Sequence, residues 1–532
     1  MKSSQVKKLP IGIDDFTTLR SNNYIYVDKT KYIYELFDPG KKYFLSRPRR
    51  FGKTLLISTL EELFKGNKDL FKGLFIYNKW DWNKEHPVIK LDFGNRSYGS
   101  ICDLNESLNN FLNRIAEKYE FALSKTSLIS DKFGELLEKI HEKTGERVVV
   151  LIDEYDKPII ANIPNLDLVI DIAKVLKSFY GVLKATYHHI EFVFVTGVSK
   201  FTNVSLFSDL NNLDDLTLDD RYNNICGYTH EELIDEFEYY INELKDKLGL
   251  SNEEIMNKIN FWYDGYSWNG KDRLYTPRST LDLFNKGKFS NYWFKSATPT
   301  FLIDVLKKSD DYSEVLNPII VKDSRLDAFE YNNLDSVAIF FQTGYLTITD
   351  EINDNNIIYY KLEFPNYEVE ISLFDFLLDL NIELNMVNND RLDFVSYIKD
   401  LDNDNFEKLL NRKFLTHIPT NIHIDMEYYY QSVILSWAKG LGFVTHGEDP
   451  TNKGFIDIAI EEDEDVFIIE CKFSKVNKKT KKPLKSFEKM LNDGISQIKA
   501  KKYHEKYHGK NIFMIAMAFA DKHVKTRIEK LN

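Results

Sequence analysis

The chain has little cysteine and no long apolar run, and both absences narrow its class. Only three cysteines, Cys102, Cys226 and Cys471, occur in 532 residues, and they form no C-x-x-C pair. Neither a disulfide framework nor a cysteine zinc site is therefore indicated, and a reducing cytoplasm is the expected compartment. The longest apolar runs reach about half of the ~20 residues that span a bilayer. Since the start also has no apolar signal-type segment, we expect neither secretion nor membrane association.

Excess positive charge and several common catalytic motifs are absent as well. The net charge of -12 argues against a protein that coats nucleic acid, although a local basic surface remains compatible with it. The eleven histidines form no H-E-x-x-H, and no serine lies in a G-x-S-x-G pattern. There are no internal repeats. Metalloprotease and serine-hydrolase classes are therefore not indicated.

The first part of the chain alternates strand-like and helix-like segments, which is typical of a parallel α/β sheet. A chain of this length also suggests about two to four domains. "RVVVLID" is a continuous apolar run of the kind expected for a strand buried on both faces. The predicted strands are 42–46, 87–93, 147–153 and 190–197, and the predicted helices are 54–66, 107–123 and 229–249.

Two further regions follow. From about residue 250 the pattern is mixed and more helical, with a hairpin around "INDN", which indicates a helical or winged-helix-like middle module. A third unit begins near residue 392, with a helix near 425–439 followed by strands and another helix. We therefore predict an α/β multidomain protein with domains 1–248, 249–391 and 392–532.

The stretch "SRPRRFGKT" resembles a phosphate-binding loop with an altered beginning. In the usual pattern, G-x-x-x-x-G-K-[ST], Gly52, Lys53 and Thr54 stand where they should, but the first glycine is replaced by Arg47. The loop lies between a predicted strand and a predicted helix, as such a loop requires. Backbone N–H groups at the helix start would hold the phosphates, Lys53 would reach them, and Thr54 would bind Mg²⁺.

A phosphate loop needs an acid at the end of a buried strand, and "VVVLIDEYD" supplies one. We predict that Asp153 holds Mg²⁺ through water and that Glu154 polarises the attacking water. Each motif alone is common, and together they predict an ATP and Mg²⁺ site. Thr196 either senses the γ-phosphate or is an ordinary polar strand end. The predicted nucleotide-binding set is Arg47, Pro48, Arg49, Arg50, Phe51, Gly52, Lys53, Thr54, Asp153 and Thr196.

The arginines of the loop allow more than one interpretation. Arg47, Arg49 and Arg50 either contact phosphates or a neighbouring subunit, or form salt bridges on the outer face of the loop. The sequence does not decide between these, and a homo-oligomer is compatible with it.

A second constellation lies in "GFIDIAIEEDEDVFIIECKFSK". In a hairpin, strand side chains alternate, so Glu470 and Lys472 share one face, with Cys471 on the other and Asp457 on the neighbouring strand. Two carboxylates beside a lysine suit a hard cation such as Mg²⁺, or Mn²⁺, and can activate a water at a phosphate. Glu427, or alternatively Glu448, could complete the metal shell.

The sequence after this hairpin is strongly basic. Residues 472–510 contain thirteen lysines and three acids, a net of 13 − 3 = +10, which suits a phosphate backbone. On the helix that follows, Gln497 and Lys501 lie one turn apart and could face the same site. E-x-K alone is common in salt-bridged surface hairpins, and lysine runs are more often solvated faces. The order helix, strand, hairpin and Gln-bearing helix favours a nuclease-like site.

Nearly end to end, the chain resembles bacterial AAA-ATPase-like proteins with a C-terminal PD-(D/E)XK nuclease superfamily domain. The stretches that carry the resemblance are "LPIGIDDFTTLRSNNYIYVDKTKYI", "FLSRPRRFGKTLLISTL", "VVVLIDEYDKPI", "TGVSKFTNVSLFSDLNNLDDLT", "ICGYTHEEL", "WYDGYSWNGKDRLYTPRSTLDLF", "FQTGYLTI" and the C-terminal D…E-x-K hairpin. The resemblance implies Lys53, Thr54, Asp153 and Glu154 for ATP and Mg²⁺. It implies Glu427, Asp457, Glu470 and Lys472 for the nuclease site, with Gln497 as an accessory.

Two positions depart from that family. It tends to have Tyr-His-Ser where this chain has Tyr430-Gln431-Ser432, and Gly-Arg-Ile-Asp where it has Gly454-Phe455-Ile456-Asp457. Both changes remove a basic side chain near the metal and affect substrate positioning, while the acids and the lysine are retained.

The sequence thus predicts an ATPase that controls a Mg²⁺-dependent nuclease acting on nucleic acid, with DNA expected over RNA. Genome defence or mobile-element biology would fit by analogy. Two alternatives remain open. One is a signalling ATPase whose nuclease-like domain only binds nucleic acid or a partner protein. The other is a scaffold that binds ATP without hydrolysing it.

Overall fold

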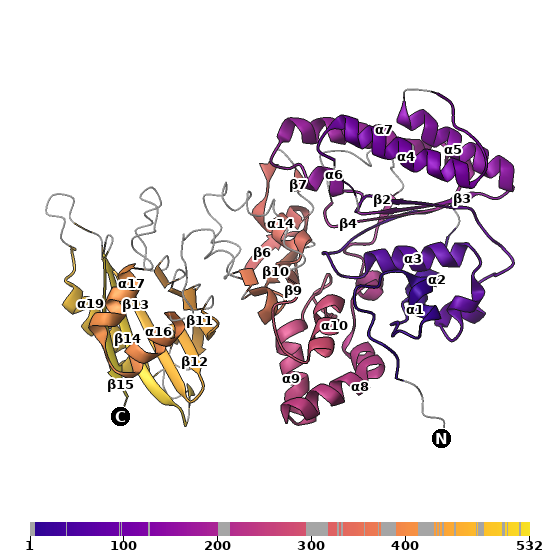
Figure 1. Ribbon diagram of the computed structural model, residues 1–532. Helices are drawn as coiled ribbons and strands as arrows, with labels where there is room; N and C mark the ends of the chain where they lie inside the picture. The colour runs from indigo at the N-terminus through magenta and orange to yellow at the C-terminus, as the bar shows by residue number, and fades with distance from the viewer. Residues whose placement is uncertain are drawn as a thin grey trace, which may run out of the picture. The chain divides into compact units, whose positions relative to one another are not determined.

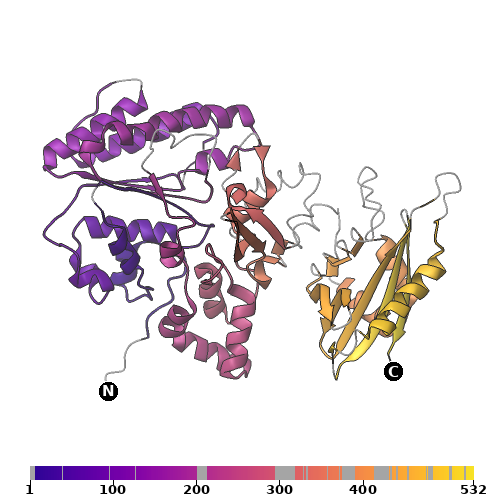
Figure 2. The same ribbon diagram turned by 180° about the vertical axis from the view of Figure 1, so that it is seen from behind.

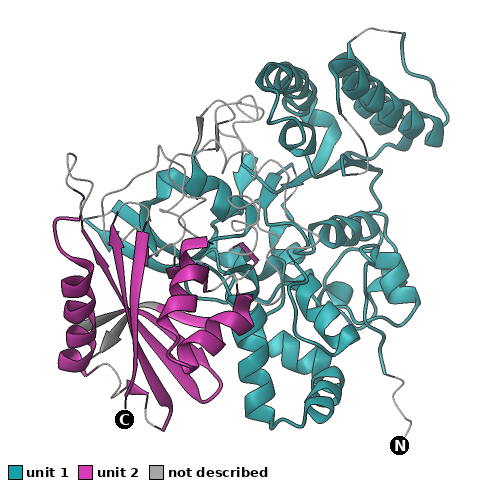
Figure 3. Ribbon diagram, turned by 60° about the vertical axis from the view of Figure 1, so that its left-hand side comes forward, with its two compact units in different colours: residues 1–370 teal, residues 371–532 magenta. Residues whose placement is uncertain are grey.

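The computed structural model describes residues 6–531 except 39, 95, 97, 126–127, 201–212, 294–317, 327–328, 331–332, 356, 371, 374–389, 413–429, 432–433, 436, 439–440, 452–453, 475, 477–482, 503–505, 508 and 521–522. The side chains of 329–330, 333–334, 447–451 and 454–456 are also outside the description. The chain forms two compact units, residues 1–370 and residues 371–532 (Figure 3). The predicted middle module falls mostly within the first unit.

The first unit contains a five-stranded sheet whose neighbouring strands are all parallel, in the order β2-β3-β4-β1-β5. β1, β3 and β4 are buried along their whole length, as expected for strands covered on both faces. The predicted parallel α/β sheet is confirmed. The strands are β1 (Lys42–Ser46), β2 (Val88–Asp92), β3 (Val148–Asp153), β4 (Ile190–Gly197) and β5 (Leu213–Asp215).

Helices cover both faces of this sheet, with α4, α5 and α7 on one side and α1, α2 and α3 on the other in both views (Figures 1 and 2). The helix predicted at 107–123 instead spans Ile101–Lys118. It starts earlier because the Ser100 hydroxyl caps it by accepting from the Asp103 N–H at 3.1 Å. The other elements are α1 (Phe16–Ser21), α2 (Thr30–Leu36), α3 (Lys53–Phe64), η1 (Lys68–Phe71), η2 (Phe75–Asn78), α5 (Ile129–Thr144), α6 (Lys157–Ile160), α7 (Leu166–Ala185) and η3 (Tyr187–His189).

The rest of the first unit is a helical layer followed by a small antiparallel sheet. α8 begins with the predicted capping box, in which Thr229 and Glu232 each bond the other's main-chain N–H. The predicted hairpin is confirmed as β9 and β10, and β10 also pairs with β6 on its other side. The elements are η4 (Asp220–Ile225), α8 (His230–Leu248), α9 (Asn252–Tyr263), α10 (Pro277–Lys286), β6 (Ile319–Lys322), α13 (Asp323–Leu326), β7 (Phe329–Glu330), β8 (Asn333–Leu334), α14 (Ser336–Thr343), β9 (Thr347–Asp354) and β10 (Ile357–Glu363).

The second unit is a mixed sheet in the order β11-β12-β13-β14-β15. β13 and β14 are parallel and are joined by α19, while the other neighbours are antiparallel. One face packs on α16 and α17 and the other on α19. The α/β fold class is confirmed in both units. The elements are α16 (Asp390–Lys399), α17 (Asn403–Leu410), β11 (Val444–Thr451), β12 (Gly454–Glu462), β13 (Asp465–Phe473), α19 (Phe487–Lys501), β14 (Asn511–Ala520) and β15 (His523–Lys530).

Among the described residues, no helix has both the length and the apolar character needed to cross a bilayer.

Candidate nucleotide and metal sites

The glycine-lysine loop connects the end of β1 to the start of α3. Gly52 precedes the helix with φ at 98°, a left-handed conformation that favours glycine, and Lys53 is the first helical residue. The Ser46 hydroxyl fixes the strand end by donating to the Val198 carbonyl at 2.5 Å. The free N–H groups of the helix start and the helix dipole make this position suited to an anion.

The ammonium group of Lys53 lies across the loop. Its Nζ donates to the main-chain carbonyls of Arg47 at 2.8 Å and Pro48 at 2.9 Å. Burial lowers the pKa of Lys53, while the negative charges of Glu154, Asp153 and Asp156 oppose that change. The sequence assigned this lysine to phosphate, and the structure brings it together with the acids that follow β3.

Asp153 ends β3 and is buried next to the end of β4. The Thr196 hydroxyl donates to its carboxylate at 2.6 Å, and the Tyr155 N–H donates to the Thr196 carbonyl at 3.0 Å. The Thr196 hydroxyl therefore holds the Asp153 carboxylate, while the Thr196 carbonyl fixes the main chain that follows β3. This contact unites two residues that the sequence predicted for the site.

Glu154 follows in a strained conformation. Its φ of 51° is unusual for a residue with a side chain, and such strain tends to accumulate at functional sites. Its carboxylate lies beside Gly94, just after β2, because a Cβ there would come within 2.9 Å of Glu154 Oε2 and 3.1 Å of Asp92 Oδ1. Asp92 stands opposite Asp153 in the sheet. Carboxylates of two adjacent strands thus meet at this edge.

Asp156 is a buried acid that the sequence reasoning did not select. Its carboxylate accepts from the N–H groups of Val198 at 2.9 Å and Ser199 at 2.7 Å. Burial raises its pKa to about 6, against the lowering effect of the Ser199 bond and of Lys53. Gly197 leaves room for it, since a Cβ there would lie 2.9 Å from Asp156 Oδ1. Its position three residues after Asp153 was the signal available in the sequence.

The side chains of the remaining loop residues differ in how far they are buried. Arg47 is 1% exposed, and its guanidinium bonds main-chain carbonyls instead of facing outward. Burial lowers its pKa to about 10. Pro48 and Phe51 are buried, Arg50 is exposed, and Arg49 and Thr54 lie between these extremes. The side chains of Arg47, Pro48 and Phe51 therefore support the loop, while its main chain and Thr54 remain suited to a nucleotide.

In the second unit, the predicted D…E-x-K hairpin is formed by β12 and β13. The Asp457 carboxylate accepts from the Cys471 N–H at 2.8 Å, so it lies against the main chain between Glu470 and Lys472. Lys472 Nζ is 2.8 Å from Glu470 Oε1. Cys471 is buried in the core on the opposite face, as the alternation predicted. The three groups are brought together.

The helix α19 crosses the same face. Ala459, Val466 and Ile468 are an even number of residues from the site residues along β12 and β13, so they share the face of Asp457, Glu470 and Lys472, and they pack in the core under α19. Gly494 on α19 lies close to β13, since a Cβ there would be 3.8 Å from the Glu470 carbonyl. Gln497, half-buried, follows three residues later, and Lys501 is exposed at the helix end.

Gln431 is a further residue at this site that the prediction did not include. Its Nε2 donates to the Asp457 carbonyl at 2.9 Å. It occupies the position where the related pattern has histidine, which was the signal in the sequence. Glu427 lies outside the described residues, and so does the side chain of Glu448.

The acids of both sites suit a cation whose remaining ligands come from water or substrate. Within the described part of the chain, no three His, Cys, Asp or Glu side chains form a ready-made metal cluster. Mg²⁺ is usually held by one or two carboxylates plus water and phosphate oxygens, so Asp153 with Thr54, and Asp457 with Glu470, suit it. The chemistry of both donor sets is therefore compatible with Mg²⁺.

The basic segment is partly neutralised where it is described. Lys499 pairs with Glu529 at 2.6 Å, and Lys510 pairs with Glu461. Lys485, Lys489 and Lys501 are exposed. Lys475 and the lysines within 477–482 lie outside the described residues. The formal charge of this segment therefore overstates its free positive charge.

Comparison with known proteins finds a family match in each of the two units. Residues 10–207 match the family model of a predicted AAA-ATPase, and residues 425–529 match the PD-(D/E)XK nuclease superfamily. An "Uncharacterized protein in vnfD 5'region" of Azotobacter chroococcum mcd 1 is 37% identical over 524 residues, 97% of this chain and 96% of the relative.

Among solved structures, the crystal structure of Cdc6p from Pyrobaculum aerophilum aligns with 64% of this chain and 88% of that chain, at 10% identity and a TM-score of 0.24. That likeness is too weak to bear on fold or function.

Proposed function

Because the chain belongs to the AAA-ATPase-like proteins that end in a PD-(D/E)XK nuclease superfamily domain, we propose that it is an ATPase controlling its own Mg²⁺-dependent nuclease. The observation that carries the proposal is the pairing of two sites in one chain. Lys53 lies near enough to Asp153 and Glu154 for their charges to act on it. Asp457, Glu470 and Lys472 meet on the sheet of the second unit.

In the first unit, the loop N–H groups and Lys53 bind the phosphates of ATP. The Lys53 ammonium has three donors, and two of them hold the carbonyls of Arg47 and Pro48, so the third donates to a charged phosphate oxygen. Asp153 and Thr54 hold Mg²⁺, and Glu154 accepts a proton from the attacking water. Thr196 keeps Asp153 oriented.

In the second unit, Asp457 and Glu470 would hold Mg²⁺, and the bound ion would supply positive charge at the scissile phosphate. Lys472 adds to that positive charge and fixes Glu470 through their ion pair. Gln497 orients water or phosphate from α19, and Glu427 completes the metal shell. The substrate is nucleic acid, with DNA proposed over RNA, and the cytoplasm is proposed as the location because the chain has only three cysteines.

ATP would control cleavage if the ATP-bound and ATP-free forms of the first unit differ in their contacts with the nuclease domain. We propose that the protein acts in genome defence or in the biology of mobile elements.

The proposal is tested by incubating the full chain with plasmid, linear and single-stranded DNA and with RNA. Each is combined with Mg²⁺ or Mn²⁺, with and without ATP. We expect cleavage of at least one DNA substrate that requires the cation and is lost in Asp457→Ala. Absence of cleavage under every condition would replace the proposal with the binding-only alternative.

A further inference from the structure

Arg47 occupies the position at which the usual phosphate loop has its first glycine, and its side chain is buried. Nη1 donates to the Ser46 carbonyl at 2.9 Å and to the Thr217 carbonyl at 3.0 Å. Nη2 donates to the carbonyls of Tyr222 at 3.2 Å and Asn223 at 3.4 Å. The side chain therefore fastens the start of the loop to the segment that leads into η4 and to η4 itself.

Arginine is tolerated here because this loop does not need glycine at its first position. Residues 46–54 are all described, and within them φ is positive only at Arg50, at 68°, and at Gly52, at 98°. The left-handed conformation that favours glycine is thus confined to the end of the loop. A glycine at position 47 would increase the conformational freedom of the main chain there, and no positive φ at that position requires it.

The guanidinium of Arg47 also lies over an aromatic ring from a distant part of the chain. Its Cζ is 4.0 Å from the centre of the Trp268 ring, within the range of a cation–π contact. The Trp268 N–H donates to the Asn223 side chain at 2.9 Å. Asn223 therefore accepts from Arg47 through its carbonyl and holds Trp268 through its amide oxygen.

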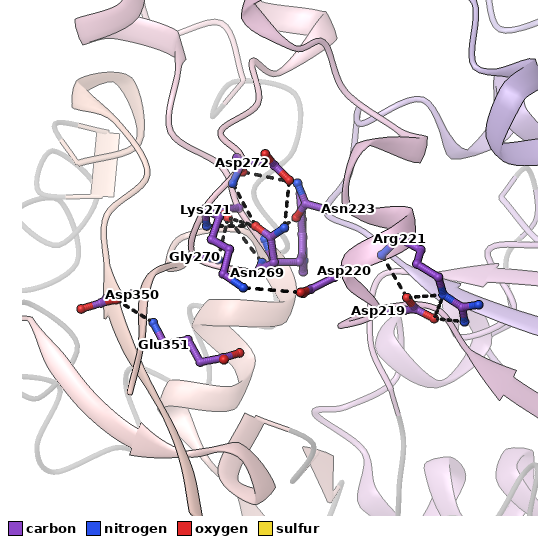
Figure 4. A network of polar contacts seen from close by, with 12 residues as sticks. Asp219, Asp220, Arg221, Asn223, Asn269, Gly270, Lys271, Asp272, Asp350 and Glu351 are labelled. Carbon is purple, nitrogen blue, oxygen red and sulfur yellow. Dashed lines mark hydrogen bonds and ion pairs between the residues drawn. The ribbon is translucent and has the colours of Figure 1, made fainter. Parts of the chain in front are cut away.

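The turn that carries Trp268 is itself rigidly bonded (Figure 4). The Asn269 side chain accepts from the N–H groups of Lys271 and Asp272, both at 3.0 Å, and donates to the Asp272 carboxylate at 3.0 Å. Asn223 Nδ2 donates to the Asp272 carbonyl at 3.3 Å. Trp268 is 5% exposed, so its ring is buried beside this turn.

The later residues of the loop also pack against distant parts of the first unit. The Phe51 ring lies 4.9 Å from Tyr266 and 5.2 Å from Trp268, centre to centre. The Trp293 indole N–H donates to the Arg49 carbonyl at 3.1 Å. Gly344 approaches Pro48 so closely that a Cβ would come within 2.7 Å of Pro48 Cβ.

These contacts bear directly on the lysine that binds phosphate. Lys53 takes its position from the carbonyls of Arg47 and Pro48. The residue that supplies the first of these carbonyls is in turn anchored by its side chain, at the carbonyls of Thr217, Tyr222 and Asn223.

We infer that Arg47 and Trp268 are positioning residues for the nucleotide site. They maintain the conformation of the phosphate loop without contacting the nucleotide. The inference rests on the proposed ATP site. It makes ATP affinity depend on a tryptophan more than two hundred positions away. It also means that restoring the usual motif with Arg47→Gly weakens ATP binding.

The test is ATP affinity, measured by calorimetry with ATP and Mg²⁺ on the full chain. We expect Arg47→Gly to raise Kd at least about tenfold, since a charged multidentate contact is lost. Arg47→Lys gives an intermediate value because it keeps the charge but loses the fork of donors. Trp268→Phe keeps an aromatic face and retains most of the affinity, whereas Trp268→Ala does not. Arg221→Gln, an exposed arginine on η4 paired with Asp219, serves as the matched control and binds ATP as the wild type does.

A double-mutant cycle separates positioning from general destabilisation. If the two residues act through one contact, Arg47→Gly with Trp268→Ala is scarcely weaker than Arg47→Gly alone. Each measurement is made well below the unfolding midpoint of that variant. Should Arg47→Gly fail to fold, Arg47→Lys and the two Trp268 variants carry the test.

Wild-type affinity in a folded Arg47→Gly or Trp268→Ala would overturn the inference and leave the proposed function intact. If the wild-type chain itself bound no ATP, the proposed function would fall and the inference with it.

Discussion

The hydroxyl of Thr196 donates to the carboxylate of Asp153 across 2.6 Å, linking the ends of two adjacent strands. Both side chains are buried, at 0% and 1% exposure, so water does not replace this bond easily. The carboxylate proposed to face Mg²⁺ is therefore oriented by a neutral hydroxyl. An arrangement of this kind fixes the direction of a metal-binding acid without changing its charge.

Thr196→Val removes that hydroxyl while keeping the shape of the side chain. A hydrogen bond to a charged group is worth about 1.5–3 kcal/mol, so we expect ATP hydrolysis to fall about tenfold or more. Phosphate release measured at saturating ATP checks this. Thr186→Val, which removes a hydroxyl bonded to a helix carbonyl, is the control and keeps normal hydrolysis. Equal rates in Thr196→Val and wild type would contradict the role given to Thr196.

Glu154→Gln separates ATP binding from hydrolysis. The glutamine keeps the size of the side chain but cannot accept a proton from water, so hydrolysis should fall by about 10²-fold or more while the Kd for ATP stays within a few-fold. Phosphate release and calorimetry measure the two quantities. Glu142→Gln, an exposed acid on α5, is the matched control. Background-level release from wild type and Glu154→Gln alike would favour the scaffold alternative.

Lys472→Ala tests the chemistry of the second unit. The lysine contacts Glu470 and is proposed to stabilise charge at the phosphate, so its loss should reduce cleavage about 10²-fold or more. Binding of DNA, measured by fluorescence anisotropy, should change by only a few-fold. Lys489→Ala removes an exposed lysine of α19 and should leave cleavage unchanged. A parallel loss of cleavage and DNA binding would make Lys472 a binding residue.

The buried carboxyl of Glu368 should make the free energy of unfolding depend on pH. Burial raises its pKa to about 7, and the nearby charge of Asp282 adds to this, although bonds from Ser279 and the Trp293 and Tyr292 N–H groups oppose it. The ordinary value is 4.5, so between these two values the folded protein holds a proton that the unfolded chain has lost. Stability conferred by the neutral acid is full below pH 4.5 and decreases as pH rises toward 7.

Glu368→Gln keeps an uncharged acceptor for the Trp293 N–H at every pH. The variant should therefore be more stable than wild type above pH 7, by an amount on the order of 3 kcal/mol. Thermal unfolding of both proteins from pH 5 to 8 checks this, with Glu363→Gln on β10 as control. An identical pH dependence in wild type and Glu368→Gln would show that Glu368 is charged in the folded protein.

Much of the local structure follows from the sequence. The apolar runs gave β1, β3 and β4 to within a residue, and the Thr229–Glu232 pair marked the start of α8. The alternation in the C-terminal hairpin placed Glu470 and Lys472 on one face. These features depend on neighbouring residues, which is why local patterns predict them.

What the sequence did not predict depends on long-range packing. Arg47 was assigned to phosphate, to another subunit or to surface salt bridges, whereas it bonds carbonyls near residues 217 and 222. Its stacking on Trp268 joins segments that no local pattern connects. Asp156 was overlooked because its partners, the N–H groups after β4, become neighbours only when the sheet forms.

Control of the second unit by ATP is the central claim, and plasmid cleavage in Mg²⁺ tests it most directly. Wild type, Lys53→Ala and Asp457→Ala are each assayed with and without ATP. We expect ATP to change the wild-type cleavage rate by about 5- to 150-fold, the usual range of coupling between sites. Lys53→Ala should cleave at one rate regardless of ATP, and Asp457→Ala should not cleave at all. A wild-type cleavage rate that is the same with and without ATP would show that ATP does not control the second unit.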